Sequence, residues 1–294
     1  MRADNVASAP STVLGRQLGD ELRGMRERAG LSTSVVAEAL DCTKGKISRI
    51  ENGRSPVRMP DLTAMLQLYG VDDPAVHERL SELARTANKR RRGSGWWSEY
   101  GHVLADTYRD FIALEAVASS VRTFQSQMIP ALLQTPDYAR ALTAASLRWQ
   151  QPEEVEQFVA VRLMRQQRLT ADPPLSLSVV LAEGALRQQV GGAAVMRDQL
   201  AHLANSASMP NVTIQVIPFS VGAHASMAGP YVILGFPSEA AMDVVLLDNP
   251  SGSMWLEGAS EVETYLGLWN DVRTKALPPA ESLELITSIK ELGA

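Results

Sequence analysis

The sequence is poor in the residues that build disulfides and metal centres. Among its 294 residues there is one cysteine, Cys42, so an internal disulfide and any site made of several cysteines are excluded. This usage is typical of a reducing cytoplasm, and a small buried thiol beside a turn is a more common role than a redox sensor. The four histidines form no cluster in the sequence, and we expect no metal site: His77, His102, His202 and His224.

Long apolar segments and phosphate-binding loops are also missing. No apolar run reaches the length of a membrane-spanning helix, and the first residues, MRADNVASAPST, are polar and unlike a signal peptide. No glycine-rich loop ends in Lys-Ser or Lys-Thr. We therefore expect a cytoplasmic protein without a cofactor, in which residues 1–13 form a flexible N-terminal arm.

Charge is distributed unequally along the chain. Residues 1–92 hold 16 of the 28 basic and 12 of the 33 acidic residues, a net charge of +4, which leaves −9 for the remainder. The chain is long enough for two domains with sizeable cores. The run Lys89-Arg90-Arg91-Arg92 followed by Gly-Ser-Gly predicts a linker at residues 89–95, between a domain at 14–88 and a larger one at 96–294.

Residues 31–60 have the pattern of two short helices joined by a tight turn. Ser32 or Thr33 can cap the first helix, whose apolar face comprises Val35, Val36, Ala39 and Leu40. Thr43 can cap the second helix, which Asn52-Gly53 ends. This arrangement is typical of a helix-turn-helix.

The second of these helices carries cations where a DNA-reading helix needs them. Such a helix places its N-terminal residues against base edges, while flanking groups hold phosphates. Ile47 and Ile50 should pack inward. We assign the base edges to Thr33, Thr43, Lys44 and Lys46, and the phosphates to Ser32, Ser48, Arg49, Asn52, Arg54 and Arg58.

This stretch resembles the XRE family of helix-turn-helix regulators, which includes the phage lambda and Cro-type repressors. The resemblance covers about residues 14–75 and rests on four segments with their spacing: LRGMRERAGLST at 22–33, VAEAL at 36–40, KISRIENG at 46–53 and LTAMLQLYGVDDP at 62–74. It implies an all-α, lambda-repressor-like head of five helices. Thr33 departs from the family, because many relatives carry a glutamine there that supports base contacts.

The basic run after the head has two readings. Lys89, Arg90, Arg91 and Arg92 can form an arm that reaches a phosphate backbone or a minor groove. They can equally form a solvated hinge that self-repulsion keeps open. A helix is expected before them, from Pro74 to about Ala87.

The larger domain has the pattern of a mixed α and β fold. Helices are expected from Tyr108 as far as Pro130, after Thr135 and over 153–169, 183–190, 194–206, 259–275 and 279–292. Strands are expected over 175–181, 211–218, 231–236, 242–247 and 253–256. The predicted fold is therefore multidomain, an all-α head joined to an α+β domain with a sheet of about five strands.

The larger domain also resembles a domain that occurs mostly in actinobacteria behind an XRE head, in regulators of the WhiJ and AbaA-linked kind. The segments that carry this resemblance are VRTFQSQMIPALLQTPDYARAL at 121–142, VVLAEGALRQQVGG at 179–192, QLAHLANSASMPNVTIQVIPFSVGAH at 199–224 and GPYVILGFP at 229–237. It implies an antitoxin-like repressor or regulator that responds to a small molecule or to a small acidic partner protein encoded nearby. We also expect a homodimer on palindromic double-stranded DNA, because one head reads only a short half-site.

Aromatic residues near both ends of this domain are candidates for the effector or partner surface. Large rings are more often core, since they bury much area. The candidate surface comprises Trp96, Trp97, Tyr100, Tyr108, His224, Trp255 and Trp269.

The alternative is a DNA-tethered enzyme. Ser226-Met227 resembles the reactive pair of LexA-type self-cleaving repressors, whose chemistry needs a desolvated lysine as base. The lysines after it, Lys275 and Lys290, fall on helices expected to be exposed. Glu183 could act as an acid, but a carboxylate at a helix N-terminus is favoured electrostatically in any case. We therefore expect no enzyme and no catalytic residue.

Overall fold

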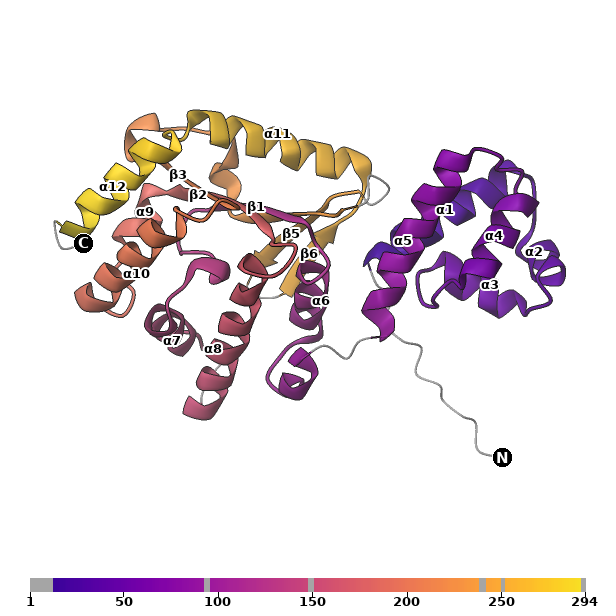
Figure 1. The fold of residues 1–294 in the computed structure, drawn as a ribbon, viewed down its shortest axis with the longest axis horizontal. Helices are drawn as coiled ribbons and strands as arrows, with labels where there is room; N and C mark the ends of the chain where they lie inside the picture. The colour runs from indigo at the N-terminus through magenta and orange to yellow at the C-terminus, as the bar shows by residue number, and fades with distance from the viewer. Residues whose placement is uncertain (1–12, 93–95, 148–150, 238–241, 250–251, 292–294) are drawn as a thin grey trace. The chain divides into compact units, whose positions relative to one another are not determined.

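A computed structural model describes residues 13–92, 96–147, 151–237, 242–249 and 252–291 of the chain (Figure 1). The chain divides into two compact units with a boundary between Ser94 and Gly95, and the segment 236–242 is grouped with the first of them. No helix among the described residues is long and apolar enough to cross a membrane.

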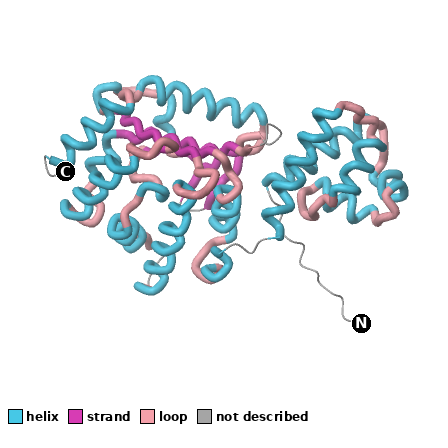
Figure 2. Tube along the Cα trace, viewed as in Figure 1, coloured by secondary structure: helices cyan, strands magenta, loops and turns pink. Residues whose placement is uncertain are grey.

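The first unit is built from helices, as the cyan tube of Figure 2 shows. Its core is formed by leucines and methionine that recur at helical spacing, among them Leu18, Leu22, Leu62, Met65 and Leu80. The five helices expected for the head are present in the described part: α1 (Val13–Arg28), α2 (Thr33–Ala39), α3 (Lys44–Glu51), α4 (Met59–Leu68) and α5 (Pro74–Arg92).

Helix α5 is longer than its sequence pattern suggested. It was expected to end at about Ala87, but it continues to Arg92. The run Lys89–Arg92 therefore lies on the last turn of a helix, where cations are favoured by the helix dipole. The side chains of these four residues lie outside the described part of the structure.

The described residues of the second unit form one sheet of six strands, in the order β3-β2-β1-β4-β5-β6. β1, β2 and β3 pair in parallel, whereas β1, β4, β5 and β6 pair antiparallel. The strands are β1 (Ser120–Gln125), β2 (Ser176–Ala182), β3 (Val212–Ile217), β4 (Tyr231–Gly235), β5 (Val244–Asn249) and β6 (Gly252–Leu256). The expectation of an α and β unit is confirmed, but the sheet has six strands and not five.

The strand that was missed, β1, lies at the centre of the sheet. Residues 108–130 were expected to form one helix, yet that helix ends at Glu115 and Ser120–Gln125 form a strand. The alternation of Val121 and Thr123 on one face with Phe124 on the other suits a strand that is covered on both sides. Pairing with β2 and β4 supplies the backbone hydrogen bonds that a helix would otherwise make.

Helices cover both faces of the sheet. In Figures 1 and 2, α11 lies across one face, while α6 and α8 lie against the other. Thr135 caps α7 as expected, since its side chain accepts a hydrogen bond from the Tyr138 amide, and α11 begins and ends where its pattern predicted. The helices are α6 (Asp106–Glu115), α7 (Pro136–Ala144), α8 (Pro152–Gln166), α9 (Glu183–Arg187), α10 (Ala193–Ser206), α11 (Ala259–Lys275) and α12 (Pro279–Glu291).

The connection between α11 and α12 protects the edge strand β3. The amide of Leu277 donates to the carbonyl of Val216 at 2.8 Å, and the Val216 amide donates to the Ser282 hydroxyl at 2.9 Å. These bonds occupy backbone groups that would otherwise remain open to pairing with another chain.

Candidate nucleic-acid interface

The two helices of the motif begin at side-chain caps. The Ser32 hydroxyl accepts a hydrogen bond from the Val35 amide at 3.3 Å, and the Thr43 hydroxyl accepts one from the Lys46 amide at 3.2 Å. These bonds satisfy amides that have no partner within the helix. Both caps agree with the sequence pattern, so the start of α3 is set by its own residues.

Helix α3 has a buried side and an exposed side. Ile47, Ile50 and Glu51 are buried. The exposed side carries Lys44, Gly45, Ser48, Arg49 and Asn52. No carboxylate lies on this exposed side, because the acidic residue of α3, Glu51, points inward. The exposed side can therefore approach a polyanion without repulsion from α3 itself.

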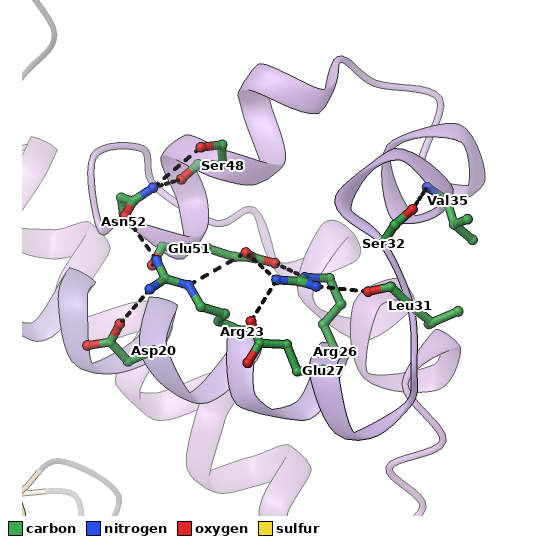
Figure 3. A network of polar contacts seen from close by, with 10 residues as sticks. All are labelled: Asp20, Arg23, Arg26, Glu27, Leu31, Ser32, Val35, Ser48, Glu51 and Asn52. Atoms are coloured by element: carbon green, nitrogen blue, oxygen red, sulfur yellow. Dashed lines mark hydrogen bonds and ion pairs between the residues drawn. The ribbon is translucent and has the colours of Figure 1, made fainter.

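The buried carboxylate of Glu51 ties α3 to α1 (Figure 3). Arg26 of α1 donates from Nε to Glu51 Oε1 at 2.6 Å and from Nη2 to Oε2 at 3.1 Å. A third bond runs from Arg26 Nη1 to the carbonyl of Leu31, at the start of the segment that leads into α2. The hydrogen bond to Glu51 raises the pKa of Arg26 above its ordinary value. One guanidinium thus orients both helices of the motif.

A second arginine reaches the end of α3. Arg23 Nη2 donates to the carbonyl of Glu51 and to Asn52 Oδ1, each at 2.9 Å. The Asn52 amide in turn donates to the carbonyl of Ser48 at 2.7 Å (Figure 3). Because its oxygen and nitrogen are both engaged, Asn52 is fixed in orientation. The sequence analysis did not identify Arg23, Arg26 or Glu51 as functional residues. Glu51 lies four residues after Ile47, on the same face of the helix, and this spacing could have indicated a buried carboxylate.

Lys46 is directed away from the exposed side of α3. Its ammonium donates to Asp61 Oδ2 at 2.7 Å, and both side chains are half-buried. Asp61 belongs to the first turn of α4, where a carboxylate is favoured by the helix dipole. The cation that was assigned to base edges is therefore held between α3 and α4.

Arg49 lies over Gly45. A Cβ at Gly45 would lie 3.3 Å from Nη1 of Arg49. The guanidinium therefore folds back toward the N-terminal half of α3 and occupies space that a larger side chain at position 45 would fill. It lies near the residues expected to face base edges.

The turn after α3 admits only glycine. Gly53 has φ of +63°, and a Cβ there would lie 2.5 Å from the backbone nitrogen of Arg16. The end of α3 is thereby packed directly on the backbone of α1. Beyond it, Arg54 and Arg58 are exposed, and Thr33 is half-buried at the start of α2.

The seven aromatic candidates do not form one surface. Trp97, Tyr100 and Tyr108 pack against the core between α6 and α8, and Trp255 lies with its ring centroid 6.4 Å from that of Phe111 on the same side of the sheet. Trp269 is buried in the core beneath α11, on the other side. Trp96 is exposed, whereas the ring of His224 packs edge-on against Phe124 at 5.4 Å between ring centroids.

The residues of the enzyme alternative have structural partners. The Ser226 hydroxyl is buried and lies 2.9 Å from the Tyr231 hydroxyl. The Lys275 ammonium forms an ion pair with Asp271 at 2.9 Å. Glu183 accepts hydrogen bonds from Arg187 Nε at 2.7 Å and from the Phe219 amide at 2.9 Å, so its carboxylate joins α9 to the segment after β3.

Comparison with protein families gave two matches, in separate parts of the chain. A model for a helix-turn-helix domain matches residues 17–80, which include α2 and α3. A model for a domain of unknown function, DUF5753, matches residues 108–288. Neither the curated proteins nor the solved structures with which the chain was compared gave a match. Since the second model spans more than half of the chain, the protein belongs to the DUF5753 family, and its first unit carries a helix-turn-helix domain.

Proposed function

We propose that the protein is a sequence-specific DNA-binding transcriptional regulator and that α3 is its recognition helix. The observation that carries this proposal is the exposed side of α3, where Lys44 and Arg49 stand on either side of Gly45 without a carboxylate among them. A helix of this kind fits the major groove, and the absence of a side chain at Gly45 leaves room for the Arg49 guanidinium beside the N-terminal residues of α3.

Base reading is proposed for Thr43, Lys44 and Arg49. A guanidinium can donate two hydrogen bonds to O6 and N7 of guanine, and an ammonium can donate to the same atoms. Arg49 takes this role in place of Lys46, because Lys46 is bound to Asp61 while Arg49 lies over Gly45.

Phosphate binding is proposed for the groups that surround α3. Arg54 and Arg58 are exposed in the connection to α4, and the first turn of α2 presents backbone amides next to Thr33. The last turn of α5, Lys89–Arg92, is a further candidate for backbone contact. These contacts would hold the head on the duplex without reading its sequence.

Regulation is proposed to reside in the second unit. Two heads on a palindromic operator require a homodimer. A ligand that binds the second unit changes the affinity for the operator if it binds more tightly to the dimer with one distance between the heads than to the dimer with another. The ligand is either a small molecule or the small acidic protein that the WhiJ-like resemblance implies.

Selection of duplexes from a random pool by the full-length protein tests the proposal, followed by affinity measurements on the selected duplex. Arg49→Ala should cost about 1–3 kcal/mol and relax the preference at one base pair. Arg58→Ala should weaken all duplexes alike and reduce the salt slope by about 0.9.

Arg85→Gln is the matched control, because Arg85 is an exposed cation of the same unit that lies on α5 outside the motif. The proposal fails if the pool yields no preferred sequence. It also fails if Arg49→Ala and Lys44→Ala bind the selected duplex as tightly as Arg85→Gln does.

A further inference from the structure

The second unit contains a cavity that none of the roles above uses. Its volume is about 210 Å³, and it lies between the sheet and α8, beside β1 and the segment that follows β1. Its walls are mainly apolar, with Phe111, Val121, Ile129 and Leu246 among them. A concave apolar site with a few convergent polar groups is the usual form of a small-molecule site.

Two arginines of α8, one helical turn apart, line this cavity. Arg165 forms an ion pair with Glu115 of α6. Its Nε and Nη2 donate to the two carboxylate oxygens of Glu115 at 2.7 and 2.6 Å, and its Nη1 donates to the Tyr108 hydroxyl at 2.6 Å. Its guanidinium carbon also lies 4.7 Å from the centroid of the Phe111 ring. The charge of Arg165 is therefore already matched by the carboxylate of Glu115.

Arg162 makes no hydrogen bond or ion pair to a carboxylate among the described residues, and Asp248 interacts with its charge only at longer range. Its Nη1 donates to the amide oxygen of Gln134 at 2.5 Å, and its guanidinium carbon lies 4.9 Å from the centroid of the Phe158 ring. Its Nε is buried and has no hydrogen-bond partner among the described residues. Burial lowers the pKa of Arg162, but a guanidinium remains protonated in a protein, so the charge persists. The side chain of Arg162 is half-buried, and a cation that is partly removed from water is costly unless an anion pairs with it.

We propose that this cavity binds a small monocarboxylate with an apolar body, whose carboxylate pairs with the guanidinium of Arg162. The planar fork of a guanidinium matches the two oxygens of a carboxylate, and the apolar walls match a hydrocarbon body. The size of the cavity limits the ligand to a small molecule, since sites for drug-sized ligands are about 300–1,000 Å³.

The other polar groups of the cavity favour a single negative charge. Asp248 lies in the lining and would repel a second one, and Glu115 is already matched by Arg165. Gln125 of β1 donates one amide proton to the Thr123 hydroxyl at 2.9 Å, and its second amide proton can donate to a hydroxyl or to a carboxylate oxygen. Inorganic phosphate, with its higher charge and no apolar part, should therefore bind worse than a carboxylate.

Binding is tested on the full-length protein labelled with ¹³C at the methionine methyl groups. Met128 lines the cavity, whereas Met65 is buried in the core of the first unit and serves as the internal control. The probes are hexanoate, benzoate and phenylacetate, with hexanol and benzyl alcohol as uncharged counterparts and phosphate as the inorganic anion. The Met128 signal, assigned with Met128→Leu, should shift and saturate with at least one carboxylate, while Met65 stays in place.

Variants separate the cation from the rest of the cavity. Arg162→Met should weaken carboxylate binding roughly tenfold or more, as expected for the loss of a charge-assisted hydrogen bond. Arg197→Met, the same substitution at an exposed position of α10, should leave binding unchanged. If Arg162→Met does not fold, Val232→Phe replaces it, because Val232 lines the cavity and a larger side chain there reduces its volume.

The proposal is overturned if no carboxylate shifts Met128 at millimolar concentration, or if alcohols and carboxylates bind alike. Equal binding by Arg162→Met and wild type also overturns it, and so does binding of phosphate in preference to the carboxylates. A regulatory role for the site rests on the proposed function. DNA binding is measured separately, from the fluorescence anisotropy of a labelled duplex from the selection. Carboxylate binding without DNA binding would refute the proposed function alone, and DNA binding without carboxylate binding would refute the site alone.

Discussion

Replacement of Glu51 by alanine should loosen the head more than any surface change on α3. The side chains of Arg26 and Glu51 are 10% and 4% exposed, so the variant would remove the buried carboxylate of the guanidinium and leave it only the exposed one of Glu27, 3.4 Å away. Breaking a buried ion pair by removing one partner costs about 3–5 kcal/mol. Two lost hydrogen bonds to a charged group, at about 1.5–3 kcal/mol each, give a similar range. Since a whole domain is stable by only about 5–15 kcal/mol, much of the stability of the head should disappear.

Hydrogen exchange measured by mass spectrometry on the full-length protein resolves this loss by region. Amides in the core of the head, such as those near Leu62, should exchange roughly a hundred- to a few thousand-fold faster in Glu51→Ala, while those of β1 keep their rate. The double variant Arg26→Met with Glu51→Leu should recover most of the protection, because two apolar groups leave no buried charge. An exposed ion pair contributes at most about 1 kcal/mol. If Glu51→Ala lowers the free energy of unfolding of the head by less than this, the Arg26–Glu51 pair is not the link that orients α3.

Three further changes test other parts of the structure. Gly53→Ala should destabilise the head by about 1–3 kcal/mol, because of the positive φ and the contact with the backbone of Arg16, and the same exchange measurement detects it. Asp61→Ala should strengthen binding to the selected duplex and change the unfolding free energy by at most about 1 kcal/mol, since it frees Lys46 from a partly exposed ion pair; weaker binding would show that the pair positions α3. Burial lowers the pKa of His202, so the unfolded chain takes up the proton first and stability should fall as the pH drops below about 6.5. Thermal unfolding of wild type and His202→Asn at pH 7.5 and pH 5 checks this, and an equal loss in both proteins would contradict it.

The local features of the head could be predicted because they depend on neighbours in the sequence. The hydroxyl of Thr43 caps α3 through an amide only three residues away, and Gly53 accepts the positive φ at the helix end without help from elsewhere. The inward direction of Ile47 and Ile50 follows from helical spacing alone. These features need no tertiary information.

The features that were missed depend on partners far away in the sequence. β1 was taken for a helix because Val121, Thr123 and Phe124 follow an apolar helical stretch without an intervening proline or glycine. Residues 120–125 form a strand because they pair with β2 and β4, which follow more than 50 residues later in the sequence. The same holds for Lys46, whose carboxylate partner comes from the next helix, where no spacing rule would have placed it.

Arg162 and Arg165 show how partners that are distant in the sequence set the charge balance of two similar side chains. The two residues have the same chemistry, lie on the same helix and face the same cavity, and the sequence presents them as equivalent. They differ because α6 supplies Glu115 to Arg165 and supplies no carboxylate to Arg162. A buried cation that the fold neutralises is part of the core, whereas a half-buried cation without a close carboxylate is expected to favour an anion from outside. A carboxylate bound at Arg162 would therefore supply the charge that Glu115 of α6 supplies to Arg165.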